Sequence, residues 1–176
     1  MKNFMKAGVS FLLFIYMICM GTVFANSSID CGKVFLKSES TKVENMKNDI
    51  SRKENLNILG YSYLSNVDES DYKYIVWKKI VTYFNSVTKE SLGIVTIESR
   101  FRYNSATKKC ECLSSSASNV CDDSASEIST FSRRRNNTTD IGGCKVKLKF
   151  KNKGVVYDNF KYDIECDYLG NIILKE

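Results

Sequence analysis

Two stretches near the end of the chain decide its fold, CKVKLKFK at residues 144–151 and FKYDIECD at residues 160–167. In both, every second residue is apolar or cysteine and the others are charged, which is the period of a β-strand with one dry and one wet face. We expect an antiparallel hairpin in which Cys144 lies opposite Cys166 and Lys145 opposite Glu165, with residues 152–158 as its loop. A slip by one residue would move every charge to the dry face.

The same alternation recurs through the middle of the chain and predicts a mainly β fold. The other expected strands are Ile58–Leu64, Tyr72–Phe84, Gly93–Tyr103, Lys108–Leu113 and Asn171–Leu174. Lys78 and Lys79 interrupt the pattern of the second of these, so we expect an irregularity there. Closely spaced turn signals favour an antiparallel β-sandwich or a flattened barrel, with an aromatic core that has Trp77 near its centre.

The N-terminus predicts export. Lys2 and Lys6 precede an apolar core, and a short Val-Phe-Ala sequence suited to cleavage follows it, so we expect a secretory signal peptide at residues 1–25, removed after Ala25. The apolar run is shorter than the ~20 residues of a membrane-spanning helix, so no transmembrane segment is expected after cleavage. The protein is therefore predicted to be secreted.

Residues 26–55 are expected to form a polar leader ahead of an antiparallel β domain at residues 56–176. Thr41 and Glu44 fit a capping box, and Val43, Met46 and Ile50 form a narrow apolar stripe, a pattern that predicts a short amphipathic helix. The alternative is a disordered leader or pro-segment, because three apolar side chains bury little surface.

Removal of the signal leaves six of the seven cysteines, an even number that predicts three disulfides in an exported chain. They are Cys31, Cys110, Cys112, Cys121, Cys144 and Cys166. Their order along the chain leaves the pairing open, except that Cys110 and Cys112 share one face of an extended segment, so each should pair elsewhere. A zinc site is the alternative, against which stand the missing histidines and the lack of a second close pair.

Composition excludes several chemistries. The chain of 176 residues has no histidine, which removes Ser-His-Asp and Cys-His nucleophile systems and the commonest metal ligand. We therefore expect no cofactor and no enzyme activity of these kinds. The net charge of +6 includes two signal-peptide lysines and is too mild to predict nucleic-acid binding.

Residues 114–143 are rich in Ser, Asn, Asp and Thr, and we expect a long loop tethered by Cys121, or a hidden strand near Glu127–Phe131. The loop contains the triplet Arg133, Arg134 and Arg135. This triplet is a candidate surface for binding a polyanion, and the alternative is an ordinary solvated charge run.

Residues Val95–Tyr103, Tyr162–Asp167 and Leu169–Ile172 carry a resemblance to a known group of proteins. Over roughly Leu56 to the C-terminus, the chain resembles small secreted β-rich proteins of Gram-positive bacteria whose function is uncharacterised. The resemblance implies a secreted β fold and brings no catalytic residues with it.

Three functions remain. The first is an extracellular binding or interaction module that contacts a cell-surface polymer or protein. The second is a hydrolase with paired carboxylates, for which Glu98, Asp163, Glu165 and Asp167 are candidates, although the last three alternate on a wet strand face opposite lysines. The third is a small secreted toxin or antimicrobial effector.

Overall fold

The computed structural model describes residues 34–62, 72–135 and 137–175, and these form nine strands. The first sheet contains β1 (Val34–Asn45), β2 (Ile50–Ser62), β3 (Lys73–Asn85), β4 (Ser91–Asn104) and β5 (Lys109–Cys121). The second sheet contains β6 (Ser126–Arg134), β7 (Ile141–Asn152), β8 (Val155–Asp167) and β9 (Ile172–Lys175). The signal peptide, the first part of the expected leader, Cys31 and the last two residues of the expected strand Ile58–Leu64 lie outside the described residues.

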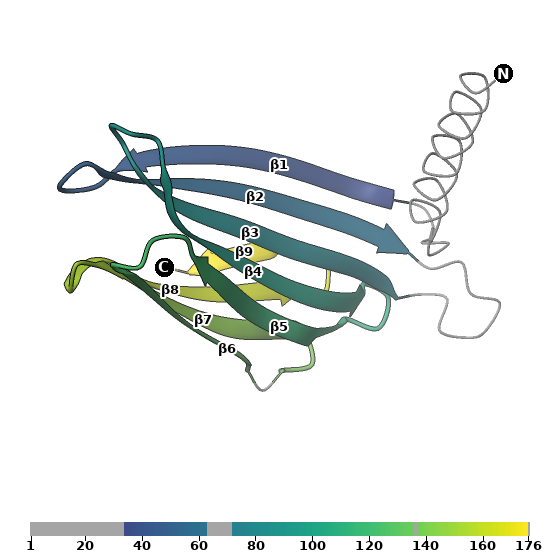
Figure 1. Ribbon diagram of the computed structural model, residues 1–176. Helices are drawn as coiled ribbons and strands as arrows, with labels where there is room; N and C mark the ends of the chain where they lie inside the picture. The colour runs from purple at the N-terminus through teal and green to yellow at the C-terminus, as the bar shows by residue number, and fades with distance from the viewer. Residues whose placement is uncertain (1–33, 63–71, 136, 176) are drawn as a thin grey trace, which may run out of the picture. The chain divides into compact units, whose positions relative to one another are not determined.

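Within each sheet the strands follow one another in chain order and pair antiparallel. The chain passes from the first sheet to the second between β5 and β6, and Figure 1 shows the two sheets as separate layers. The predicted mainly β, antiparallel sandwich is confirmed, and the two sheets do not close into the flattened barrel that was its alternative. β1 is one edge of the larger sheet, and the short β9 is one edge of the smaller.

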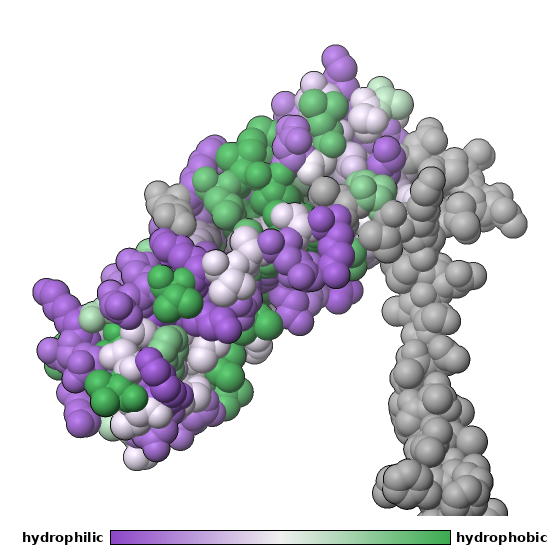
Figure 2. Space-filling model, turned by 90° about the horizontal axis from the view of Figure 1, so that it is seen from above, coloured by the Kyte–Doolittle hydropathy of each residue, from purple (hydrophilic) through white to green (hydrophobic). Residues whose placement is uncertain are grey.

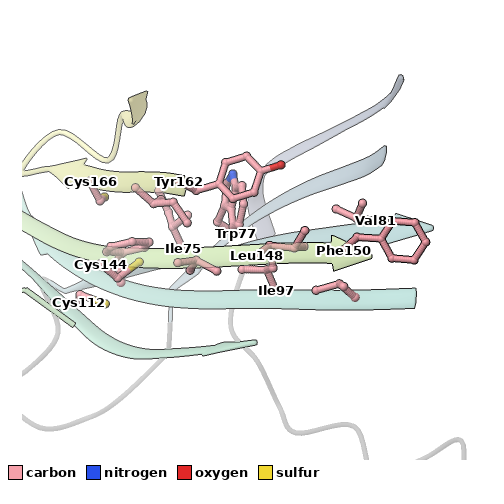
Figure 3. Close-up of a cluster of buried hydrophobic side chains, with 14 of the residues drawn as sticks. Ile75, Trp77, Val81, Ile97, Cys112, Cys144, Leu148, Phe150, Tyr162 and Cys166 are labelled. Carbon is pink, nitrogen blue, oxygen red and sulfur yellow. The ribbon is translucent and has the colours of Figure 1, made fainter. Parts of the chain in front are cut away.

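The core lies between the two sheets, because alternation along the strands of each sheet turns apolar side chains toward the other sheet (Figure 3). Trp77 is completely buried, as its predicted central position requires. The aromatic rings of Tyr83 and Phe150 stack across the layers with centroids 4.0 Å apart. Such stacks contribute beyond the area that they bury, about 0.5–1.5 kcal/mol each.

The hairpin of β7 and β8 forms, but its predicted register was wrong by two residues. Cys144 lies opposite Ile164 rather than Cys166, and Lys145 lies opposite Asp163 rather than Glu165. The cause is a two-residue turn at Lys153 and Gly154, both with positive φ, in place of the long loop we expected. A β-bulge beside the turn then adds one residue, which returns the apolar side chains of both strands to the same face.

The amphipathic helix predicted around Thr41–Ile50 was wrong, since these residues belong to the β1–β2 hairpin. Its turn contains Asn48 and Asp49, both with φ of 55°, a conformation that these residue types tolerate better than most. The apolar stripe does not form, because Val43 is 58% exposed whereas Ile50 is buried. Pairing with β2 along the whole of β1 outweighs a weak local preference for helix.

Most of the expected Ser-rich loop at residues 114–143 is also strand. β5 continues to Cys121, and β6 extends the strand that we had considered near Glu127–Phe131. Ser115 on β5 hydrogen-bonds both the buried Ser99 and Ser132. Most of the other polar side chains of β5 and β6 are exposed, so the polar composition reflects the exposure of these two strands rather than a loop.

Candidate functional site

A cluster of charged residues lies inside the sandwich, where β2 and β3 face β8. We call Arg52, Glu54, Lys79 and Asp158, with Tyr83 and Tyr162, the ionic cluster. Alternation along β2 turns Arg52 and Glu54 to the same side as Leu56 and Ile58, which pack against the core. The β2–β3 register sets Arg52 beside Tyr83 and Leu56 beside Lys79, which brings these groups together.

Arg52 is the centre of the cluster and contacts three carboxylates with three different nitrogens. Its Nη1 lies 2.8 Å from Oδ2 of Asp158, its Nη2 lies 2.6 Å from Oε2 of Glu44, and its Nε lies 3.2 Å from Oε1 of Glu54. The last contact is an ion pair without hydrogen-bond geometry. The guanidinium also lies 3.9 Å from the centre of the Phe160 ring, a cation–π contact that completes its desolvation.

Lys79 supplies the second buried positive charge. Its Nζ is 2.7 Å from Oε2 of Glu54 and donates to the hydroxyl of Tyr162 at 3.3 Å. The hydroxyl of Tyr83 donates to Asp158 at 2.7 Å. The irregularity predicted at Lys78 and Lys79 was wrong, because β3 pairs regularly through both residues and the inward lysine is held by its partners.

Burial dominates the electrostatics of this cluster. It raises the pKa of Asp158 above its ordinary value, although the hydrogen bond from Tyr83 and the charge of Arg52 pull in the opposite direction. Burial also raises the pKa of Tyr83 and Tyr162, and the neighbouring carboxylates Asp158 and Glu54 add to this effect. For Arg52, burial alone would lower the pKa, but Asp158 and Glu54 raise it, so the guanidinium stays charged.

The arrangement suits cohesion between the sheets better than proton transfer. Asp158 and Glu54 are the only two carboxylates of the ionic cluster, and each is held by a buried cation and a tyrosine. The open depression described below has none of these six side chains in its walls. We therefore assign the cluster a structural role, as a polar bridge between β2, β3 and β8.

The outer face of β1, β2 and β3 carries an open depression of about 370 Å³. Its walls are formed by Glu39, Ser40, Thr41, Asn55, Leu56, Asn57, Lys78 and Ile80. Two hydrogen bonds hold its polar side chains in place, from Thr41 to Oδ1 of Asn55 at 3.0 Å and from Asn57 to Oε1 of Glu39 at 3.1 Å. The depression therefore offers amide, hydroxyl and charged groups beside a small apolar surface.

Four of the six predicted disulfide cysteines come together inside the sandwich. Cys110 and Cys112 point inward from β5, Cys144 from β7 and Cys166 from β8, and all four are buried. Cys121 is exposed, and all five described cysteines are free thiols in the structure, so the predicted disulfides stay a prediction. Among the described residues, no group of three or more Cys, Asp or Glu side chains is arranged to hold a metal ion.

The three arginines of the predicted triplet do not share a surface. Arg133 is exposed on β6, and Arg134 donates to the carbonyl of Leu113 at 3.1 Å. Arg135 donates from one nitrogen to both Asp163 and Glu165, at 2.7 Å each. Because neighbours in an extended segment alternate between faces, the triplet is divided between different contacts.

The carboxylates considered for a hydrolase are also held by partners. Lys175 and then Arg135 lower the pKa of Glu165, the opposite of what a general acid requires. Glu98 pairs with Arg100 at 2.8 Å, and Asp167 accepts hydrogen bonds from the turn before β9. Asp163 is shared by Arg135 and Lys145.

Sequence reasoning missed the ionic cluster, because Arg52 had been placed in a leader and Asp158 in a loop. A signal was present, since Ile50, Arg52, Glu54, Leu56 and Ile58 follow a period of two. Charges on an otherwise apolar face require buried partners, and the interruption at Lys79 pointed to one of them.

Comparisons of the chain with protein-family models, curated proteins and solved structures gave no match. The resemblance to small secreted proteins of Gram-positive bacteria therefore stays a prediction. In the described part of the chain, no helix has the length and apolar character needed to cross a membrane.

Proposed function

We propose that this protein is an exported β-sandwich that binds a polysaccharide of the cell surface through the outer face of β1, β2 and β3. The observation that carries the proposal is the depression lined by Glu39, Thr41, Asn55 and Asn57. Amides both donate to and accept from sugar hydroxyls, the carboxylate of Glu39 accepts from them, and Ile80 provides an apolar surface for the ring carbons.

Two features of the fold support this role. The hydrogen bonds within the depression pre-arrange its side chains, which lowers the entropy lost on binding. β1 is an edge strand whose described side chains are mostly exposed, so the site lies where a long polymer can reach it (Figure 1). Figure 2, the view from above, shows a strip of hydrophobic side chains bordered by hydrophilic ones, a mixed surface that suits such a ligand.

The test is calorimetric titration of the chain from Asn26 onward with purified cell-wall polysaccharides. The double variant Asn55→Ala, Asn57→Ala removes two amides of the depression and should weaken binding at least tenfold. Asn159→Ala, at an exposed position on β8, is the matched control and should bind like the unaltered chain. Equal affinity of the double variant and the control, or no binding to any wall polysaccharide, would overturn the proposal.

A further inference from the structure

The four buried thiols lie as two pairs that each join one sheet to the other. The side chain of Cys112 on β5 is a neighbour of Cys144 on β7, and the side chain of Cys166 on β8 is a neighbour of Cys110 on β5. Figure 3 shows Cys112, Cys144 and Cys166 at the same end of the buried cluster. From these contacts we propose that Cys110 bonds to Cys166 and Cys112 to Cys144, which gives two disulfides between the sheets.

The backbone geometry explains why the two sheets come close enough at this place. Sheets that pack face to face are usually about 10 Å apart, whereas the Cα atoms of a disulfide lie about 4.4–6.8 Å apart. Gly142 on β7 removes the obstacle, since a Cβ there would lie 2.5 Å from the backbone nitrogen of Cys112 and 2.5 Å from the carbonyl carbon of Glu111. The amide of Cys110 also donates to the carbonyl of Thr139, which ties β5 to the segment leading into β7.

The register places Cys144 and Cys166 at different positions along the second sheet. Cys166 lies opposite Gly142 on the neighbouring strand, and Cys144 is two residues farther along β7. Each of the two thus meets a different member of the β5 pair. Cys121 is about 30 Å along the strand from Cys112, at the other end of β5, so it cannot compete for these partners.

The environment of the sulfurs favours oxidation once an oxidant is present. The neighbouring Cys112, Ser115 and Ser99 side chains lower the pKa of Cys144 despite its burial, which favours the thiolate that attacks in disulfide formation. In the balanced step, this thiolate attacks a disulfide of an oxidising thiol–disulfide exchange protein or of oxidised glutathione. This forms a mixed disulfide and releases the first thiol of the oxidant. Cys112 then loses its proton and attacks the Cys144 sulfur of the mixed disulfide, which forms the Cys112–Cys144 bond and releases the second thiol, so the oxidant has taken up both electrons.

The pairing depends on the proposed export, since disulfides persist in oxidising compartments, and does not depend on the proposed binding. The test is to refold the chain from Asn26 onward in a glutathione redox buffer, block free thiols, and map the bonds without reduction. A Glu-specific protease cleaves after Glu111 and so separates Cys110 from Cys112. We expect the Cys110 peptide linked to Cys166 and the Cys112 peptide linked to Cys144.

The control variant Cys121→Ser should leave both bonds intact and the denaturation midpoint unchanged, because Cys121 is exposed. The variant Cys112→Ser, Cys144→Ser should lose one bond and retain the other, with a lower midpoint that reducing agent lowers further. A crossed pairing, a bond between Cys110 and Cys112, four blocked thiols in the folded chain, or their protection by stoichiometric Zn²⁺ would each overturn the proposal. If only the proposed export is wrong, the thiols will be reduced in the protein taken from the cell, but the refolded protein will still show the two expected bonds.

Discussion

Replacement of Arg52 by Met should destabilise the protein far more than replacement of its partner Asp158 by Asn. Without the guanidinium, Asp158 keeps the hydrogen bonds from Tyr83 and from the backbone of Asn159 but has no cation beside it, and its side chain is 4% exposed. Removing one partner of a buried ion pair costs about 3–5 kcal/mol, because an uncompensated charge stays behind. Asp158→Asn leaves Arg52 with Glu44 and Glu54 and weakens one charged hydrogen bond, a loss of about 1.5 kcal/mol.

Urea unfolding measures this difference, with the fluorescence of the single, fully buried Trp77 as the signal. Urea is preferable to guanidinium chloride because it does not screen charges. With a slope of about 2 kcal/mol per M, the midpoint should fall by about 2 M for Arg52→Met and by less than about 1 M for Asp158→Asn. Lys42→Met removes an exposed cation that is 67% accessible, and should change the midpoint little.

The pH dependence gives a second check with a defined sign. Burial raises the pKa of Asp158 in the folded protein, so the folded state binds more protons than the unfolded state above about pH 4. The stability contributed by this group therefore increases as the pH falls through the raised pKa. Arg52→Met raises the pKa of Asp158 further, so this variant should regain stability relative to the unaltered protein between pH 7 and pH 5. Two results would refute the reasoning. One is an equal loss of unfolding free energy for Arg52→Met and Asp158→Asn, and the other is a difference in stability between Arg52→Met and the unaltered protein that does not become smaller at pH 5.

Two other outcomes are expected. Gly142→Ala should lower the free energy of unfolding by about 3 kcal/mol, because the new Cβ would lie 2.5 Å from backbone atoms of β5. Gly154→Ala should lower it by about 1 kcal/mol, because Gly154 has a φ of +75° but nothing within 4 Å of the new Cβ. The same urea measurement tests both variants. Tyr83 and Tyr162 should not ionise in the folded protein at pH values that titrate exposed tyrosines, since burial raises the pKa of both. Because they ionise once unfolded, stability should fall as pH rises above about 10, which phenolate absorbance followed against pH will test.

These two predictions have clear contrary results. A similar loss for both glycine variants would mean that β5 and β7 can separate at little cost. Ionisation of all nine tyrosines of the chain from Asn26 onward in one step near the ordinary pKa, before any change in Trp77 fluorescence, would mean that Tyr83 and Tyr162 are accessible to solvent.

Much of the fold was predictable because strand alternation is a local property. The inward positions of Val95, Ile97 and Phe101 follow from the period of two, and all are completely buried. β1 was not predictable in this way, because its residues carry a local helix pattern and become a strand only by pairing with β2. The Ser-rich strands were not predictable for a related reason, since serine favours turns locally and these residues become strands by pairing with β4 and β7.

For the candidate sites, the sequence indicated which residues take part better than it indicated which residues contact one another. It identified the cysteines and arginines, but Arg135 is held by two carboxylates of β8, a contact that depends on how β6 and β7 pair. The surface depression brings Thr41 next to Asn55 through the β1–β2 register, which no local pattern encodes.

The sequence by itself determined that this chain forms β-strands with one dry face, and which side chains of β7 and β8 lie on it, because alternation needs no knowledge of distant residues. Tertiary structure alone decided the register of that hairpin, because a shift by two residues keeps every side chain on its face. Only the turn at Lys153 and Gly154 and the nearby bulge distinguish the observed register from the predicted one. It also decided which cysteine meets which and that Arg52 meets Asp158, because contacts between sheets depend on how two separately twisted layers are packed together.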